Sequence, residues 1–369
     1  MYIYHLKYKV AWSTPFWQSV FDNLLTAYNL DTNLVQLVNG WADAGEALVE
    51  SADKITFIGS PEVGKLVMKH AANTLTPVIL ELGGKDVAIV FDDADYDQVV
   101  QVALRGTFQN SGQNCAGLER LVVQDGIYDM FVGDMLKYIS NLRVGPPLER
   151  DVDMGAMTMN SQIKKIQQLV DDAVKAGARL LSGGKQHIDT EYPHGQYYLP
   201  TLLVDVTPSM RIAQEEVFGP VMCIMKFSSE KEAVDLANSS PYALGSSVFT
   251  LDTERGERVA KLIRAGMCNV NDFGANYLCQ GLPFGGIGIS GIDRFAGVEG
   301  LRGNCNIRSA TSDRFYGIRT NLPPMLRFPL ARASTKFQES LIGMLYGASW
   351  TDSAKSMANL VAVAVTGKA

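Results

Sequence analysis

Residues 77–91 read P-V-I-L-E-L-G-G-K-D-V-A-I-V-F, two short apolar runs separated by a pair of glycines. Runs of this length, 77–82 and 86–91, are typical of buried strands, and the glycine pair indicates a turn between them. A helical pattern follows at about 95–109, with apolar residues on one face. Strands and helices in close succession predict an α/β fold with a largely parallel sheet.

The same alternation extends in both directions along the chain. Pro61 opens one helix, because proline is suited to the first helical position. Residues 335–365 read as one or two amphipathic helices, which we expect to dock on the rest of the chain. The pattern further predicts strands at 5–12, 34–38, 54–58 and 119–124 and helices at 16–28, 42–50, 61–73, 127–140 and 160–176.

The composition is that of an ordinary globular protein, with 47% apolar and 20% charged residues among 369. A net charge of −6 disfavours nucleic-acid binding, because phosphate backbones attract basic surfaces. The five cysteines form no C-x-x-C pair and histidines number four, so we expect neither a disulfide framework nor a metal site. No apolar run reaches the roughly 18 residues of a membrane span.

Glu81 ends the first apolar run, directly before the two glycines. A carboxylate buried there is costly unless it is paired or protonated, and burial raises its pKa toward neutrality, which suits a general base. The alternative is a glutamate at a strand end that simply reaches solvent. The residues around Glu81 leave both interpretations open.

Cys115 lies in S-G-Q-N-C-A-G, residues 111–117, between glycines that let the backbone approach a ligand closely. A thiol attacks as its thiolate, which nearby donors and helix N-termini stabilise. The alternative is a buried cysteine that acts as a small apolar side chain. The polar, glycine-rich surroundings leave the two interpretations evenly matched.

Three further segments combine glycine with residues suited to a ligand. Gly59, Ser60 and Gly64 span a strand–helix turn whose free N–H groups suit a phosphate, although an ordinary turn has the same pattern. Q-E-E-V-F-G-P, residues 214–220, offers Glu216 to a ribose hydroxyl. Phe218 and Phe284 fit either a ring contact or plain core packing.

E-L-G-G-K-D, G-Q-N-C-A-G, E-E-V-F-G-P and P-F-G-G occur in this order and together resemble the NAD(P)-dependent aldehyde dehydrogenase superfamily. The resemblance covers about residues 9–310, and the first two motifs are highly specific. The segment N-D-F-G-A-N-Y-L-C-Q-G-L-P-F-G-G looks most like the plant and fungal branch called family twenty-two. The resemblance implies an incomplete Rossmann-type cofactor domain over 1–83, an α/β catalytic domain over 84–300, and an oligomerisation segment with a helical tail over 301–369.

This resemblance also implies a reaction, the oxidation of an aldehyde to a carboxylic acid with NAD or NADP. Cys115 matches the cysteine that forms a thiohemiacetal and then a thioester. Glu81 matches the glutamate that activates this cysteine or the hydrolytic water. Phe284 lies where the family lines its substrate tunnel, and together with Phe273 and Tyr277 it favours apolar aldehydes.

Several residues match the family's cofactor contacts. Gly59, Ser60 and Gly64 correspond to the turn and helix beside the pyrophosphate, and Glu216 corresponds to the glutamate that holds the nicotinamide ribose. The segment K-V-A-W-S-T-P, residues 9–15, looks like the family's K-P-S-E-x-T-P, with Trp12 in place of the glutamate. The full set of cofactor residues implied by the resemblance is Lys9, Gly59, Ser60, Gly64, Leu82, Glu216 and Phe218.

The family chain is longer at its N-terminus, where a W-N-Y-P-like segment supplies an oxyanion-hole asparagine that this sequence lacks. We therefore expect an N-terminally truncated chain, and losing one such donor typically slows catalysis by about 10²–10³. A second hypothesis is a non-catalytic subunit or scaffold, and a third is a thiol esterase that uses Cys115 and Glu81 without a cofactor. The resemblance further implies a homo-oligomer in the cytoplasm or on the cytosolic face of an internal membrane, with membrane association only for a longer form.

Overall fold

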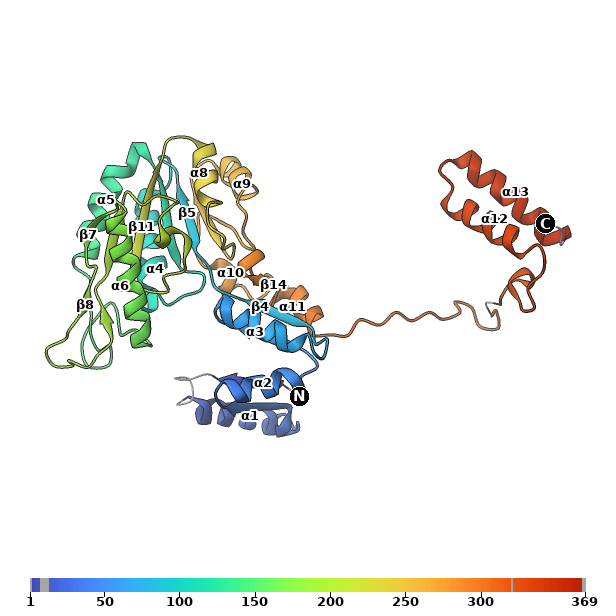
Figure 1. Cartoon of the computed structure of the whole chain (residues 1–369), viewed down its shortest axis with the longest axis horizontal. Helices are drawn as coiled ribbons and strands as arrows, with labels where there is room; N and C mark the ends of the chain where they lie inside the picture. The colour runs from blue at the N-terminus through green and yellow to red at the C-terminus, as the bar shows by residue number, and fades with distance from the viewer. Residues whose placement is uncertain (1, 7–12, 320, 367–369) are drawn as a thin grey trace. The chain divides into compact units, whose positions relative to one another are not determined.

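The computed structural model describes residues 2–6, 13–319 and 321–366, with side chains from residue 13 onward. The chain divides into two compact units, residues 1–306 and 307–369. Strands and helices alternate along the first unit (Figure 1), which confirms the predicted α/β class. The predicted division at residue 83 lies inside the first unit and stays a prediction.

A seven-stranded sheet forms the framework of the first unit. Its neighbouring strands are parallel except for the antiparallel pair of β10 and β7 at one edge. The strands predicted at 86–91 and 119–124 are β5 and β6 near its centre. In spatial order the strands are β13 (Asn269–Val270), β12 (Ser246–Phe249), β5 (Asp86–Val90), β6 (Leu118–Gln124), β11 (Val221–Phe227), β10 (Thr201–Val204) and β7 (Arg179–Ser182).

Helices cover both faces of this sheet. On one face α4 (Tyr96–Phe108) and α5 (Asp125–Ile139) pack against alternate strand residues such as Val90 and Leu121. On the other face α6 (Asn160–Lys175), α8 (Glu230–Ala237) and α9 (Thr253–Ala260) pack against the intervening residues, such as Ile89 and Val122. Because both faces are covered, the central strands are apolar almost throughout, which explains the continuous apolar runs of the sequence.

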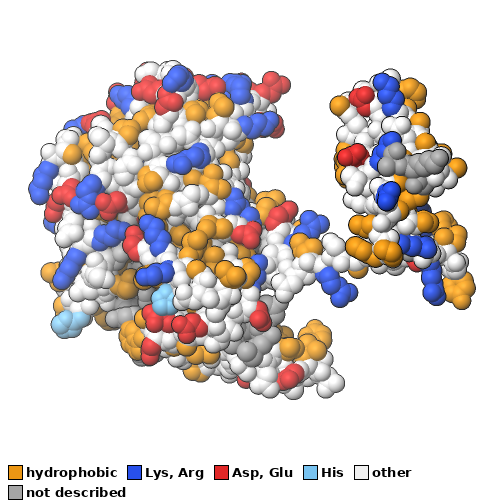
Figure 2. Space-filling model, turned by 45° about the vertical axis from the view of Figure 1, so that its right-hand side comes forward, with side chains coloured by type: hydrophobic (Ala, Val, Ile, Leu, Met, Phe, Trp, Pro, Cys, Tyr) orange, Lys and Arg blue, Asp and Glu red, His pale blue; other side chains and the backbone are white. Residues whose placement is uncertain are grey.

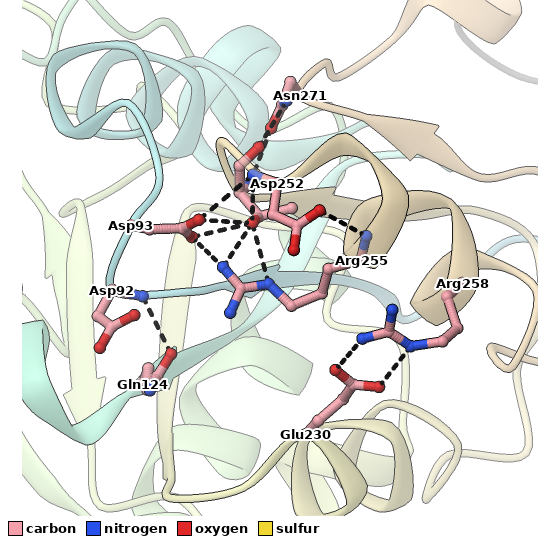
Figure 3. Close-up of polar contacts among 9 residues, drawn as sticks. Asp92, Asp93, Gln124, Glu230, Asp252, Arg255, Arg258 and Asn271 are labelled. Carbon is pink, nitrogen blue, oxygen red and sulfur yellow. Dashed lines mark hydrogen bonds and ion pairs between the residues drawn. The ribbon is translucent and has the colours of Figure 1, made fainter.

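A network of polar contacts lies at the carboxyl ends of β5 and β12 (Figure 3). Arg255 on α9 forms an ion pair with Asp93 and donates to Thr250 Oγ1 over 2.7 Å. Asn271 donates to the carbonyl of Thr250 over 2.8 Å, which ties the segment after β13 to the same point. The guanidinium of Arg255 also lies 4.3 Å from the ring centroid of Phe91. These contacts fasten α9 to the sheet.

The N-terminal region, defined here as residues 2–6 and 13–82, carries smaller sheets. β1 (Tyr2–Leu6) pairs in parallel with β2 (Val35–Asn39), so the strand predicted at 5–12 begins earlier, and residues 7–12 lie outside the described part. β3 (Ile55–Ile58) pairs in parallel with β4 (Val78–Glu81), whose other edge takes the antiparallel strand β14 (Gly291–Ile292). The helices of this region are α1 (Thr14–Ala27), α2 (Ala42–Ser51) and α3 (Pro61–Ala71), with a short 3₁₀ turn, η2 (Thr32–Leu34).

Short elements complete the first unit. They are η3 (Gln109–Gly112), β8 (Gln186–His187), β9 (Tyr197–Tyr198), α7 (Arg211–Gln214), α10 (Ala275–Leu278), η4 (Gly288–Ser290) and α11 (Gly297–Gly303). β8 and β9 pair antiparallel as a small hairpin. η3 and α10 lie in the sequence beside the motifs that contain Cys115 and Phe284, so they help to place the candidate site.

The second unit consists mainly of two helices, α12 (Ser334–Tyr346) and α13 (Trp350–Thr366), after the short turn η5 (Pro324–Leu326). Together the two helices match the predicted 335–365 segment to within one residue at each end, and they pack on each other through Phe337 and Val363. Large apolar side chains remain exposed on them, including Tyr346 and Trp350, and Figure 2 shows apolar side chains on the surface of this unit. The expected docking of these helices on the rest of the chain stays a prediction.

Candidate active site

Glu81 is the last residue of β4, and its backbone is held from both sides. Its strand neighbours are Ile58 on β3 and Gly291 on β14, so the side chain is 2% exposed and does not reach solvent. Burial raises the pKa of Glu81, while the Cys115 thiol within hydrogen-bonding reach and the backbone of Gly83 oppose this shift. Its Oε1 atom has no hydrogen-bond partner among the residues that the structure describes. Glu81 is therefore a buried carboxyl that lines the same cavity as the Cys115 thiol.

Cys115 follows η3 in a tight loop before β6. Gly112 has φ +70°, and a Cβ atom there would lie 2.1 Å from the carbonyl oxygen of Gly219, so the loop packs directly on that backbone. Burial raises the pKa of the Cys115 thiol well above its usual range, and the negative charges of Glu81 and Asp86 raise it further. Ionisation of this thiol at neutral pH would require a proton acceptor, and the Glu81 carboxyl lies on the same cavity wall.

A cavity of about 230 Å³ opens beside the thiol. Phe284 and Phe295 form one wall through rings whose centroids are 4.9 Å apart. The full lining is Ile58, Glu81, Asn114, Cys115, Ala116, Asn276, Tyr277, Cys279, Gln280, Phe284, Phe295 and Ala296. The surface facing the thiol is thus mostly apolar, with Glu81 as its ionisable carboxyl. Phe273, expected in the same tunnel, instead lines a smaller adjoining cavity with Asp86.

Glu216 lies against the glycine pair that follows Glu81. Its Oε1 accepts a hydrogen bond from the backbone N–H of Gly84 over 3.0 Å. Gly83 has φ +77°, and a Cβ atom there would lie 2.3 Å from the same oxygen, so this position requires glycine. Burial raises the pKa of Glu216 to about 8, and the charge of Glu119 adds to the shift. Two carboxyl groups, Glu81 and Glu216, thus flank one turn.

The turn predicted to contact a phosphate forms the start of α3. Ser60 is the N-cap, and its Oγ accepts from the backbone of Val63 over 3.4 Å. Gly59 and Ser60 are exposed, whereas Gly64 is buried and its missing Cβ would lie 2.3 Å from Leu82 Cδ2. Gly64 therefore allows α3 to approach Leu82, while the helix end stays open to a ligand. The backbone of Gly59 donates to the backbone carbonyl of Glu81 over 3.0 Å, which joins this turn to the end of β4.

The structure thus brings most of the predicted residues together. Cys115, Glu81 and Phe284 share one cavity, and Glu216 is linked to them through Gly84. Phe218 adopts φ +49° and donates its backbone N–H to Glu119 over 2.8 Å. Lys9 and Trp12 lie outside the described residues.

Several polar residues of the site were not foreseen. Asn114, Asn276, Cys279 and Gln280 complete the cavity wall. The charged residues Lys85, Asp86, Glu119 and Arg120, which stand close to Glu81 and Cys115 in the chain, are buried as well. The signal that could have found them is that charged residues stand inside otherwise apolar strand runs, where burial requires a partner. Their partners come from distant parts of the chain, so spacing alone does not identify them.

The described residues form neither a metal-binding cluster nor a membrane-spanning helix. Among them no group of three or more His, Cys, Asp or Glu side chains could hold a metal ion. In the same part of the chain, no helix combines the length and apolar character that crossing a membrane requires.

The fold and the site define a class: an α/β protein in which a thiol and a buried carboxyl share a cavity beside a glycine turn. This chain belongs to the aldehyde dehydrogenase family, whose sequence model matches residues 6–310. It is 42% identical over 342 residues to an aldehyde dehydrogenase-like protein, C21C3, of Schizosaccharomyces pombe, covering 92% of this chain and 65% of that protein. It is 38% identical over 296 residues to a chloroplastic betaine aldehyde dehydrogenase of Beta vulgaris, covering 79% of this chain and 58% of that protein.

Solved structures give the same result. The crystal structure of betaine aldehyde dehydrogenase from Staphylococcus aureus in complex with NAD⁺ superimposes with a TM-score of 0.70 at 36% identity. The match covers 73% of this chain and 53% of that chain. This chain therefore spans between about half and two thirds of the length of these family members.

Proposed function

We propose that this protein oxidises an aldehyde to the carboxylic acid with NAD⁺ or NADP⁺ through Cys115. The observation that carries the proposal is that the Cys115 thiol and the buried Glu81 carboxyl line one cavity, close enough for each to shift the pKa of the other. Membership of the aldehyde dehydrogenase family supports the same reaction.

In the first step Glu81 accepts the proton of the Cys115 thiol. The thiolate then attacks the aldehyde carbon, a C–S bond forms, and the carbonyl electron pair moves to oxygen, giving a thiohemiacetal. The mostly apolar walls around Phe284 keep bulk water from the thiol, which strengthens the electrostatic interactions inside the site.

The residues beside the cavity fit a nicotinamide dinucleotide. Glu216 is held by Gly84 where a glycine pair leaves room on the turn, and the exposed Ser60 end of α3 offers a helix N-terminus to a phosphate. When bound, the cofactor supplies the acceptor for the hydride that leaves the substrate. Glu216 would hold the nicotinamide ribose, Gly59, Ser60 and Gly64 the pyrophosphate, with Leu82 and Phe218 beside it. Lys9 would contact the adenine-side ribose.

After the hydride has left the substrate, Glu81 releases the proton of the thiol to solvent, and in the last step it accepts a proton from a water molecule that attacks the acyl group on Cys115. The C–S bond breaks, the carboxylic acid leaves, and the thiol is restored by the proton that Glu81 holds. The raised pKa of Glu81 suits both transfers, because a group that titrates nearer to neutrality can accept a proton and return it.

The cavity supports a small uncharged aldehyde with an apolar or aromatic side chain as substrate. Phe284, Phe295 and Tyr277 offer rings, and no cationic side chain is among the residues lining the cavity within the described part of the chain. We further propose a homo-oligomer in the cytoplasm or on the cytosolic face of an internal membrane, to be tested by light scattering and by fractionation.

The decisive experiment measures reduced cofactor and carboxylate formed by the purified chain from a series of aliphatic and aromatic aldehydes. We expect equal amounts of the two products, with apolar aldehydes ahead of charged ones. Failure to form either product from any aldehyde, by a folded protein, would overturn the proposal.

A further inference from the structure

Glu119 is a buried carboxylate whose partners all come from segments of the site. It is 5% exposed and lies in β6, close after Cys115. One oxygen accepts from Lys85 Nζ over 2.5 Å, and the carboxylate also accepts from the backbone N–H groups of Val217, over 2.9 Å, and Phe218, over 2.8 Å. A single side chain therefore joins the segment after Glu81 to the segment that carries Glu216.

These contacts close a ring. Lys85 is next to Gly84 in the chain, Gly84 donates to Glu216, and Glu216 is next to Val217, which donates back to Glu119. The ring includes Phe218 at φ +49°, a conformation that non-glycine residues rarely adopt without support from their surroundings. Both N–H groups of the 217–218 turn are directed into the same carboxylate, which supplies that support.

Arg120, the next residue in the chain, connects β6 to a helix that covers one face of the sheet. Its guanidinium donates to the carbonyls of Lys85, Leu236 and Ala237, the last two at the end of α8 on the sheet face. Glu119, by contrast, has its side-chain partners in the segments of Glu81 and Glu216 alone, within the described residues. The two adjacent charged residues share Lys85 as a partner, but Arg120 also reaches the end of α8, whereas Glu119 reaches the segment of Glu216.

We infer that Glu119 is a positioning residue that holds Glu216 against Gly84 and so fixes the Glu216 carboxyl relative to Glu81. The inference rests on the proposed function, because Glu216 is there assigned to the cofactor. The geometry works through charge: a carboxylate satisfies both backbone donors and the Lys85 ammonium at once. The glutamine side chain has one oxygen and one NH₂ group. Its NH₂ group would then face Lys85 or a backbone N–H group, which is itself a donor.

The test compares Glu119→Gln with a matched control elsewhere in the fold. Asp189 is 4% exposed, accepts from the backbone N–H groups of Glu191 over 2.9 Å and Tyr192 over 3.0 Å, and pairs with Arg150. Asp189→Asn therefore removes the same kind of charge from the same kind of turn. Glu119→Asp, which keeps the charge but shortens the reach, serves as the variant that folds if Glu119→Gln does not.

Two readouts are measured on the full chain: amide hydrogen exchange across residues 214–220, and the dissociation constant of NAD⁺. We expect both Glu119 variants to exchange faster at 214–220, and Glu119→Gln to weaken NAD⁺ binding about 10- to 100-fold, the size of a lost charge-assisted hydrogen bond. Asp189→Asn should change neither readout.

Unchanged exchange at 214–220 in both Glu119 variants overturns the inference, as does faster exchange with unchanged NAD⁺ affinity. An equal loss of affinity in Asp189→Asn also overturns it, because the effect would then be a general one of stability. A wild-type chain that does not bind NAD⁺ contradicts the proposed function instead, and amide exchange then decides the role of Glu119.

Discussion

The seven-stranded sheet and the N-terminal region bury their strands to very different extents. Residues such as Leu121 and Ile224 of the sheet have no exposed surface. In the N-terminal region β3 alternates between half-buried and exposed residues, and Phe16 and Trp41 are 64% and 60% exposed. Cys115 lies in the loop before the tightly packed strand β6, and Glu81 ends β4, a buried strand of the N-terminal region, while the helix end proposed for the pyrophosphate stands on an exposed part of that region.

The difference teaches how the site is built. The backbone of Glu81 is held by its strand neighbours Ile58 and Gly291, and the loop of Cys115 is held by the direct packing of Gly112 on the backbone of Gly219. Regions with fewer buried apolar contacts open at lower free energy cost. We therefore expect substitutions in the two regions to separate chemistry from cofactor binding, and core stability from surface effects.

The largest expected effect is the loss of chemistry in Cys115→Ala. Removing a nucleophile lowers the rate by on the order of 10⁴-fold or more, and the reduced cofactor formed with aldehyde measures it. Binding of NAD⁺ should persist, because Glu216 and the start of α3 remain. Cys279→Ala, which removes the other thiol of the same cavity, is the control. An equal loss in this control would contradict the role of Cys115.

The second largest expected effect is a difference in the free energy of unfolding between two phenylalanine variants. Phe131 on α5 has no exposed surface, so Phe131→Ala should cost about 3–5 kcal/mol of unfolding free energy. Phe16 on α1 is 64% exposed, so Phe16→Ala should change it by less than about 0.5 kcal/mol. Urea unfolding of both variants gives the comparison. Similar losses of unfolding free energy in the two variants would show that Phe16 is as well packed as Phe131, which contradicts its exposure in the structure.

The free energy of unfolding should depend on pH because Asp86 is buried. Burial raises its pKa in the folded chain to about 8, against about 4 in an unfolded chain. The stability contribution of the protonated group is fully present below about pH 4 and lost as pH rises through about 8. Relative to Asp86→Asn, the wild type should lose more than about 1 kcal/mol between pH 5 and pH 8.

Asp153→Asn should show a pH dependence of the unfolding free energy opposite in sign to that of Asp86→Asn, in the same set of unfolding measurements. Hydrogen bonds from Arg143 lower the pKa of Asp153, so its contribution is present at neutral pH and lost as pH falls below about 4. If the unfolding free energies of Asp86→Asn and the wild type change equally with pH from about 4 to 8, Asp86 is not a protonated buried group.

The smallest expected effect separates two helical glycines. Gly64 on α3 packs on Leu82, so Gly64→Ala should cost about 1 kcal/mol as that side chain moves aside. Gly133 on α5 has nothing within 4 Å of its missing Cβ, so Gly133→Ala should gain about 0.5–1 kcal/mol from helix propensity. Thermal unfolding measures both. A gain in Gly64→Ala would mean that α3 does not approach Leu82 as closely as described.

Much of the fold was predictable because each element is specified locally. The apolar run before the glycine pair is β4, the run after it is β5, and the helix predicted at 95–109 is α4 at Tyr96–Phe108. Periodicity identifies such elements because a strand or helix buried on a known face must repeat its apolar residues. The paired sheets of the N-terminal region were less visible, since β14 joins β4 from residues far along the chain.

The candidate site was predictable in its parts rather than in its arrangement. Cys115 and Glu81 stood out because a thiol among glycines and a carboxylate at the end of an apolar run are both unusual. Whether Glu81 faces solvent or a thiol remained open, and the structure places it within reach of Cys115. The role of Glu119 had no local signal, because its backbone donors are 98 and 99 residues away in sequence.

The sequence alone therefore determined the α/β class, most element positions and the motifs of the aldehyde dehydrogenase family, because these depend on local patterns. The tertiary structure alone decided which groups meet. It buries Glu81, keeps Cys115 a neutral thiol and presses Glu216 on the glycine turn. These properties depend on burial and on partners distant in the chain, since a pKa and a hydrogen bond are set by what folding brings nearby.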